Sequence, residues 1–175
     1  MAHGIKNYIR LSASPQVSVL STGVFTSVDL SAFVDPLHSL AFHIVSADIQ
    51  LTQSTAPYGL CNSTSVTSGN AIGMQFATGA QTAMLRPNDG KVIYHKFASY
   101  IVDTDAVTSW TEETFNVKTL WPDGYIAVVD NLTAMLQGTA NLSSGDFRMS
   151  YTITGYQKKV SANQLASLLV AQTQS

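Results

Sequence analysis

The sequence predicts an all-β protein, a sandwich or barrel of about eight short antiparallel strands with a short C-terminal α-helix. Apolar and polar residues alternate in several stretches, and clusters of Gly, Pro, Asn and Asp separate these stretches. Composition is the third observation. The 175 residues are 45% hydrophobic and only 11% charged. Counted along the sequence, 38 residues are Ser or Thr, and they stand where soluble β proteins usually carry Lys and Glu.

The first half of the chain predicts strands at 8–12 and 17–20, on either side of Pro15, which suits an edge or a bend. A short helix is expected at 29–34. The stretch 43–51 has the clearest alternation and predicts a half-buried strand. Its inward face is expected to carry Val45, Ala47, Ile49 and Leu51.

The second half predicts a weak hairpin of 71–77 and 81–85 around Gly79, and a long strand at 91–102. Strands are also expected at 124–130, 135–142 and 148–156, separated by turn signals. The inward face of the last strand is expected to carry Met149, Tyr151 and Ile153.

At the end of the chain, the spacing of apolar residues changes from the alternation of a strand to the period of a helix. Ser161 and Gln164 have the spacing of a capping box, and Leu165, Leu168 and Leu169 fall on one face of the helix that follows. The sequence thus divides into a β-sandwich at 1–160 and a C-terminal helix and tail at 161–175. A helix this short is marginal alone, so we expect it to dock on its own sandwich or on a neighbour. Our hypothesis is that the three leucines anchor it on an adjacent subunit.

Charge and length exclude several classes of protein. The net charge is −2, the pI is about 6.0, and only Lys6 and Arg10 are cationic among the first fifteen residues, so we expect no direct nucleic-acid binding. The start lacks the apolar core of a signal peptide, and the longest nearly apolar segment, 165–171, is too short for a membrane span. We expect a chain that is made in a cytoplasm and is not transmembrane. Cys61 is the single cysteine and cannot form an intrachain disulfide.

Few residues suggest chemistry. Asp103, Asp105 and Glu112, with Glu113, form the densest carboxylate group and are weak candidates for Ca²⁺ ligands, although a solvated acidic loop explains them more simply. His38 and His43 flank a strand but match no zinc spacing, and His95 reads as an ordinary strand residue. No nucleophile elbow, Walker A loop or dinucleotide fingerprint occurs in the sequence. We therefore expect no enzyme activity and no cofactor.

Two stretches resemble the opening strands of single jelly-roll viral capsid proteins: Phe25-Thr-Ser-Val-Asp-Leu-Ser-Ala-Phe-Val and Leu40-Ala-Phe-His-Ile-Val-Ser-Ala-Asp-Ile-Gln-Leu. The closing order of 124–142, 148–156 and a short helix is similar to that family too. The resemblance implies a single jelly roll of about eight antiparallel strands. It also implies a coat subunit that self-assembles into a shell in the virion, with further copies of itself and other virion proteins as partners. That family often has a basic N-terminal arm, which this chain lacks, so another component is expected to handle the genome.

Two other interpretations stay open. The first is a carbohydrate- or receptor-binding sandwich, such as a spike or fibre tip, in which Tyr58, Trp110 and Trp121 stack on sugars; aromatic residues in such loops are as often lids on the core. The second is a small enzyme on a cupin-like barrel, which needs a compact histidine cluster. His38, His43 and His95 do not have the spacing of such a cluster.

Overall fold

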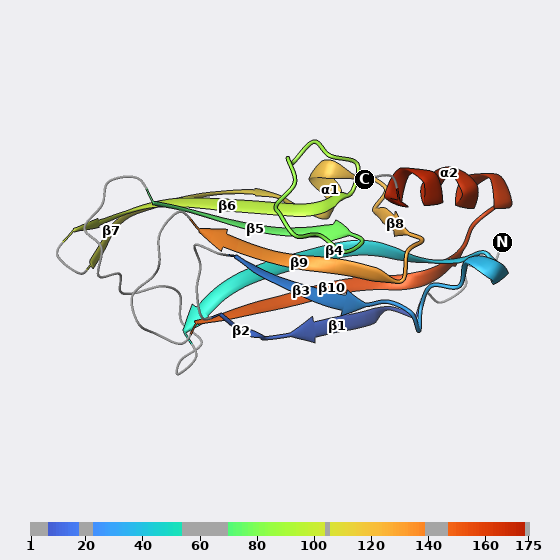
Figure 1. The fold of residues 1–175 in the computed structure, drawn as a ribbon, viewed down its shortest axis with the longest axis horizontal. Coiled ribbons are helices and arrows are strands. Elements are labelled where there is room, and N and C mark those ends of the chain that lie inside the picture. Colours follow the sequence, from blue (N-terminus) through green and yellow to red (C-terminus); the bar gives the residue numbers. More distant parts are fainter. Residues whose placement is uncertain (1–6, 18–22, 54–69, 104–105, 139–146, 174–175) are drawn as a thin grey trace.

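The structure is a computed structural model that describes residues 7–17, 23–53, 70–103, 106–138 and 147–173. Two antiparallel sheets pack face to face, and a helix lies at one end of them (Figure 1). The first sheet contains β1 (Ile9–Ala13), β2 (Gln16–Val17), β4 (Leu40–Gln53), β8 (Tyr125–Ala127) and β10 (Phe147–Lys159). The second sheet contains β3 (Val24–Asp29), β5 (Asn70–Thr78), β6 (Val92–Asp103), β7 (Ala106–Phe115) and β9 (Asn131–Gly138). The all-β prediction with a C-terminal helix is confirmed.

The strand pairs are nested along the chain. Both β1 and β2 pair with β10, β3 pairs with β9, β4 pairs with β8, and β5 pairs with β6. Two further pairings, β10 with β4 and β9 with β5, join these pairs into the two sheets. Strand β7 extends the second sheet as a hairpin on β6. Early strands of the chain are therefore paired with late strands in both sheets.

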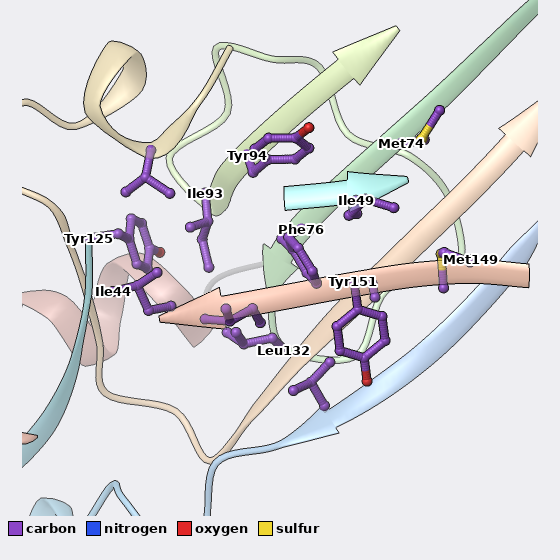
Figure 2. Close-up of a cluster of buried hydrophobic side chains, with 14 of the residues drawn as sticks. Ile44, Ile49, Met74, Phe76, Ile93, Tyr94, Tyr125, Leu132, Met149 and Tyr151 are labelled. Atoms are coloured by element: carbon purple, nitrogen blue, oxygen red, sulfur yellow. The ribbon is translucent and has the colours of Figure 1, made fainter. Parts of the chain in front are cut away.

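The core lies between the sheets, and aromatic side chains occupy its centre (Figure 2). Phe76 stands edge-on to Tyr94 and Tyr151, with ring centroids 6.1 and 5.6 Å apart. The Tyr94 hydroxyl donates to Asp48 across 3.0 Å, and its burial raises the pKa of this tyrosine. Burial also raises the pKa of Tyr125 to about 12. Both phenols thus stay neutral hydrogen-bonding groups at physiological pH.

The predicted inward face of β10 is confirmed, because Met149, Tyr151 and Ile153 are all buried. On β4 the predicted alternation holds for Ile49 and Leu51, but it fails at Val45. The register jumps from Ser46 opposite Thr154 to Ile44 opposite Gly155, so Val45 is an extra residue in a β-bulge. Beyond the bulge the even-numbered residues face inward.

Four other sequence expectations are corrected. Residues 81–85 form no strand, and Glu112 and Glu113, expected with Asp103 and Asp105 in a solvated acidic loop, lie on β7. The predicted helix at 29–34 is a turn, in which the Asp29 carboxylate accepts the Ser31 backbone N–H at 2.8 Å. A 3₁₀ helix, η1 (Pro36–His38), follows it. Strand β9 begins at Asn131, four residues before the expected start.

Two α-helices occur in the described part of the chain. The single-turn α1 (Val117–Leu120) is capped by the Asn116 side chain, which accepts the Thr119 backbone N–H. The longer α2 (Ala162–Thr173) begins after Ser161, whose hydroxyl accepts the Gln164 backbone N–H at 3.2 Å. The predicted N-cap is thus confirmed. Among the described residues, no helix combines the length and the apolar character that crossing a bilayer requires.

Candidate interaction surfaces

The predicted carboxylate site does not come together in the described residues. Glu112 lies on β7 and forms an ion pair with Lys96 at 3.2 Å. Asp103 ends β6 opposite Ala106, with its side chain outside the described residues, and Asp105 also lies outside them. In the part of the chain that the structure describes, no three His, Cys, Asp or Glu side chains are grouped as a metal would need. Ca²⁺ binding at these residues stays a prediction.

Two of the histidines serve the local structure. The ring of His38 donates from Nδ1 to the Asp35 carboxylate at 2.5 Å, and this hydrogen bond lowers the pKa of Asp35. His43 is buried and donates from Nε2 to the backbone oxygen of Asp123 at 2.7 Å. This contact fixes the turn before β8, where Gly124 has a φ of +84°.

His95 lies on the second sheet, away from the other two, and is only 9% exposed. Its Nδ1 accepts a hydrogen bond from the Gln75 amide at 2.9 Å, which places the ring proton on Nε2 in the neutral form. Burial lowers the pKa of His95 and so favours that neutral form. The cupin-like cluster of histidines is not assembled by these positions.

Trp121 is a lid on the core. Its indole N–H donates to the Val92 backbone oxygen at 2.8 Å, and its ring stands edge-on to Tyr125 at 5.1 Å. Tyr58 and the Trp110 side chain lie outside the described residues, as do Cys61 and the first six residues.

Helix α2 docks on its own sandwich. The leucines predicted as an interface, Leu165, Leu168 and Leu169, are half-buried against a cluster of Ala41, Val128 and Val160. Val170 is 53% exposed and is the large apolar side chain that this helix presents to solvent. The role of the three leucines between subunits stays a prediction.

A buried glutamine that sequence reasoning missed fixes the end of α2. Gln172 is 4% exposed; its amide accepts the Val128 N–H at 3.0 Å and donates to the Ile126 oxygen at 2.7 Å. These are the bonds that a neighbouring strand would make with β8, so Gln172 occupies part of this sheet edge. The signal in the sequence is a polar residue at position 172, on the same helical face as the apolar residues of α2.

In the described part of the chain, no further strand pairs with the outer edge of the second sheet at β7. Strand β7 is the last strand on its side of the second sheet, and its described side chains from Thr111 to Thr114 are exposed. An extended edge of ten residues is a template for pairing with another chain.

Exposed apolar side chains lie on both sheets and on the turns between strands. Leu37 in η1 is 93% exposed, Tyr8 is 58% exposed, and Phe97 on β6 is 39% exposed. Exposed polar residues without charge surround much of the first sheet. Exposed apolar side chains of this kind are candidates for an interaction surface.

Comparison with models of protein families and with curated proteins finds no match for this sequence.

Proposed function

We propose that the sandwich is a single jelly roll. The nested pairs β1/β2–β10, β3–β9, β4–β8 and β5–β6 support this, because a jelly roll is a double sheet made of two Greek keys in which the chain crosses repeatedly between the sheets. Successive strands β1, β3, β4 and β5 alternate between the first and second sheets in this way.

We propose further that the chain is a non-catalytic viral coat subunit that self-assembles into a shell. The observation that carries this proposal is the low share of charged residues on the outward face of the first sheet. Ser12, Gln50, Ser150 and Thr152 are exposed or half-buried there, and Arg10, Asp48 and Arg148 are the charged residues among them. Soluble monomers usually protect such sheets with lysine and glutamate, whereas walls between subunits avoid unpaired charges.

The partners in this proposal are further copies of the chain and other virion proteins. A subunit inside a shell contacts several neighbours, and each stable contact covers on the order of a thousand Å². The open β7 edge supplies one such surface. With a net charge of −2, the subunit is proposed to leave the genome to another component and to reach the virion from the host cytoplasm.

The test is the mass of the purified full-length chain, measured by light scattering over a wide concentration range, with negative-stain microscopy of any large species. We expect closed particles of uniform size. A chain that stays monomeric at high concentration and neutral pH contradicts the proposal.

A specific observation favours a second function, binding of a carbohydrate or receptor. A shallow hollow of about 600 Å³ on the first sheet is lined by the side chains of Arg10, Asp48 and Gln50 and by several serine hydroxyls. Hydroxyl, amide and carboxylate groups are suited to hydrogen-bonding sugars. A small oligomer with affinity on a glycan array, lost in Asp48→Ala, supports this second function.

A further inference from the structure

The turn at η1 presents a leucine to solvent on a tightly held backbone. Leu37 is 93% exposed, the largest exposure among the apolar side chains of the described residues. The Asp35 carboxylate accepts the Leu37 and His38 backbone N–H groups at 3.1 and 3.3 Å. Asp35 and Leu40 also exchange both of their backbone hydrogen bonds, at 2.9 and 2.8 Å. The turn is closed at its base, with Leu37 at its tip.

Such an arrangement is suited to binding. An apolar side chain in water gains by burial, and a backbone that is already ordered loses little entropy when it docks. Leu37 contributes nothing to the core of its own chain, and the hydrogen bonds that order the turn do not involve its side chain. We call Leu37 with the turn that holds it the Leu37 knob.

A pocket lies directly beside the knob. Its volume is about 620 Å³, and it is lined by the turn before η1, by the segment that follows β5, by the β8–β9 connection and by α2. Apolar lining comes from Val34, Pro36, Val128, Val129 and Leu169. Because Pro36 lines the pocket and Leu37 is the next residue, the knob and the pocket are neighbours on one surface.

We propose that this surface binds a second copy of the chain about a twofold axis, with each Leu37 knob in the pocket of the other copy. A twofold contact uses the same patch on both subunits. Each copy can therefore insert its knob into the pocket of the other copy and receive the other copy's knob in its own pocket. The inference rests on the proposed function and names one contact through which coat subunits associate.

The Asp35 carboxylate of the knob complements a cation of the pocket. On the knob, this carboxylate accepts a hydrogen bond from the His38 ring. The pocket is lined by one cation, Lys91, and one carboxylate, Asp130. Neither lining charge forms an ion pair with a charged group elsewhere in the described residues. In the reciprocal contact Asp35 of each copy meets Lys91 of the other, which favours one orientation of the two copies.

The first test compares Leu37→Asp with the matched variant Val170→Ser by analytical ultracentrifugation of the full-length chain. Leu37→Asp is expected to weaken the dimer at least tenfold, because it places a charge in the apolar part of the pocket. Val170 is also an exposed apolar residue but does not line the pocket, so its variant is expected to retain wild-type affinity. Ala80→Trp, which fills the pocket from the other side, is expected to match Leu37→Asp.

A cross-linking test identifies the two surfaces directly. In a Cys61→Ser background, Leu37→Cys and Ala80→Cys proteins are mixed under mild oxidation. A disulfide-linked heterodimer is expected in excess over the product of either protein alone. No heterodimer, together with wild-type dimerisation of Leu37→Asp, overturns the inference.

The outcomes separate this contact from the shell itself. Particles that form unchanged in both Leu37→Asp and Ala80→Trp overturn the twofold contact and leave the coat proposal standing. Wild-type dimers that never form particles, but dissociate in these variants, support the contact and contradict the coat proposal. A wild-type monomer at all concentrations contradicts both.

Discussion

The outward faces of the two sheets differ in how they are covered. On the first sheet, Ser150 and Thr152 of β10 stay half-buried, and Gln50 of β4 is exposed. On the second sheet, Gln75 and Thr133 are almost fully buried by the segment between β5 and β6 (Figure 1). Both faces carry polar residues at alternate positions. The polar residues under the covering segment become structural anchors, whereas no described segment covers those of the first sheet, which are left available for binding.

Gln75 shows what covering does. Its amide accepts the Leu85 N–H at 2.9 Å and donates to the Leu85 oxygen at 2.8 Å. The side chain thus makes the two backbone hydrogen bonds with the covering segment that a neighbouring strand would make. Gln50, on the open face, donates only to Asp48 two residues away among its described contacts, at 2.9 Å. The same residue type therefore has two different energetic roles in one fold.

The largest expected effect comes from a glycine-to-alanine substitution in the first sheet, which we compare with the same substitution in the second sheet. At Gly155 a new Cβ would lie 2.5 Å from the His43 backbone oxygen and 2.7 Å from the Phe42 ring. We expect Gly155→Ala to lower the free energy of unfolding by ~3 kcal/mol, since β4 backbone cannot move easily. At Gly73 the new Cβ meets the flexible end of Met84, 2.8 Å away. Gly73→Ala should cost under about 1 kcal/mol. Equal losses in urea unfolding would contradict this difference.

The next effect tests the two glutamines directly. Gln75→Ala leaves the N–H and oxygen of the half-buried Leu85 and Nδ1 of the buried His95 without their partner, so we expect a loss of about 2–3 kcal/mol in unfolding free energy. The control, Gln50→Ala on the open face, should change it by less than about 0.5 kcal/mol. Chemical denaturation of both variants measures the contrast. If Gln50→Ala lowers the free energy of unfolding as much as Gln75→Ala, the outward face of the first sheet is covered as well.

A third variant extends the comparison to the covered end of the first sheet. Gln172→Ala removes the two hydrogen bonds that join α2 to β8, and we expect a loss of about 1–2 kcal/mol. Amide hydrogen exchange should accelerate across α2 while the β10 amides keep their protection. Asn163→Ala, at an exposed position in the first turn of α2, is the control and should leave both exchange rates as in the wild type.

The smallest effect is a pH dependence of the covered face. Burial lowers the pKa of His95 in the folded chain, whereas the unfolded chain titrates near the usual value of about 6.5. The unfolded state therefore binds the proton more tightly, so stability is retained above pH 6.5 and falls as the pH drops below it. The slope should stay under ~1.4 kcal/mol per pH unit, the limit for one proton. In His95→Gln this part of the slope should vanish; identical slopes in both proteins would show that His95 does not carry it.

Much of the fold was predictable because alternation is a local property of the chain. The inward face of β10 and the length of β6 follow from the order of apolar and polar residues. The bulge at Val45 was not predictable, because a bulge depends on the pairing with Gly155 rather than on β4 alone. Residues 81–85 were expected as one arm of a weak hairpin around Gly79, but the Gln75 side chain makes hydrogen bonds with Leu85 that a strand partner would have made.

The candidate surfaces were predictable only in part. The helical face of Leu165, Leu168 and Leu169 was visible in the sequence, although the choice between docking on its own sandwich and docking on a neighbour was not. The exposure of Leu37, which stands in the stretch Asp-Pro-Leu-His-Ser, was not among the sequence predictions. Its position beside a pocket depends on segments that are distant in the sequence.

The sequence by itself determined the β class, the low charge, the turn positions and the cap of the C-terminal helix, because each depends on residues a few positions apart. Tertiary structure decided which outward face is covered, which edge is closed by Gln172, and where the Leu37 knob finds a pocket. These outcomes depend on contacts between segments far apart in the chain, and no local pattern encodes which of several compatible partners will be adjacent in the folded protein.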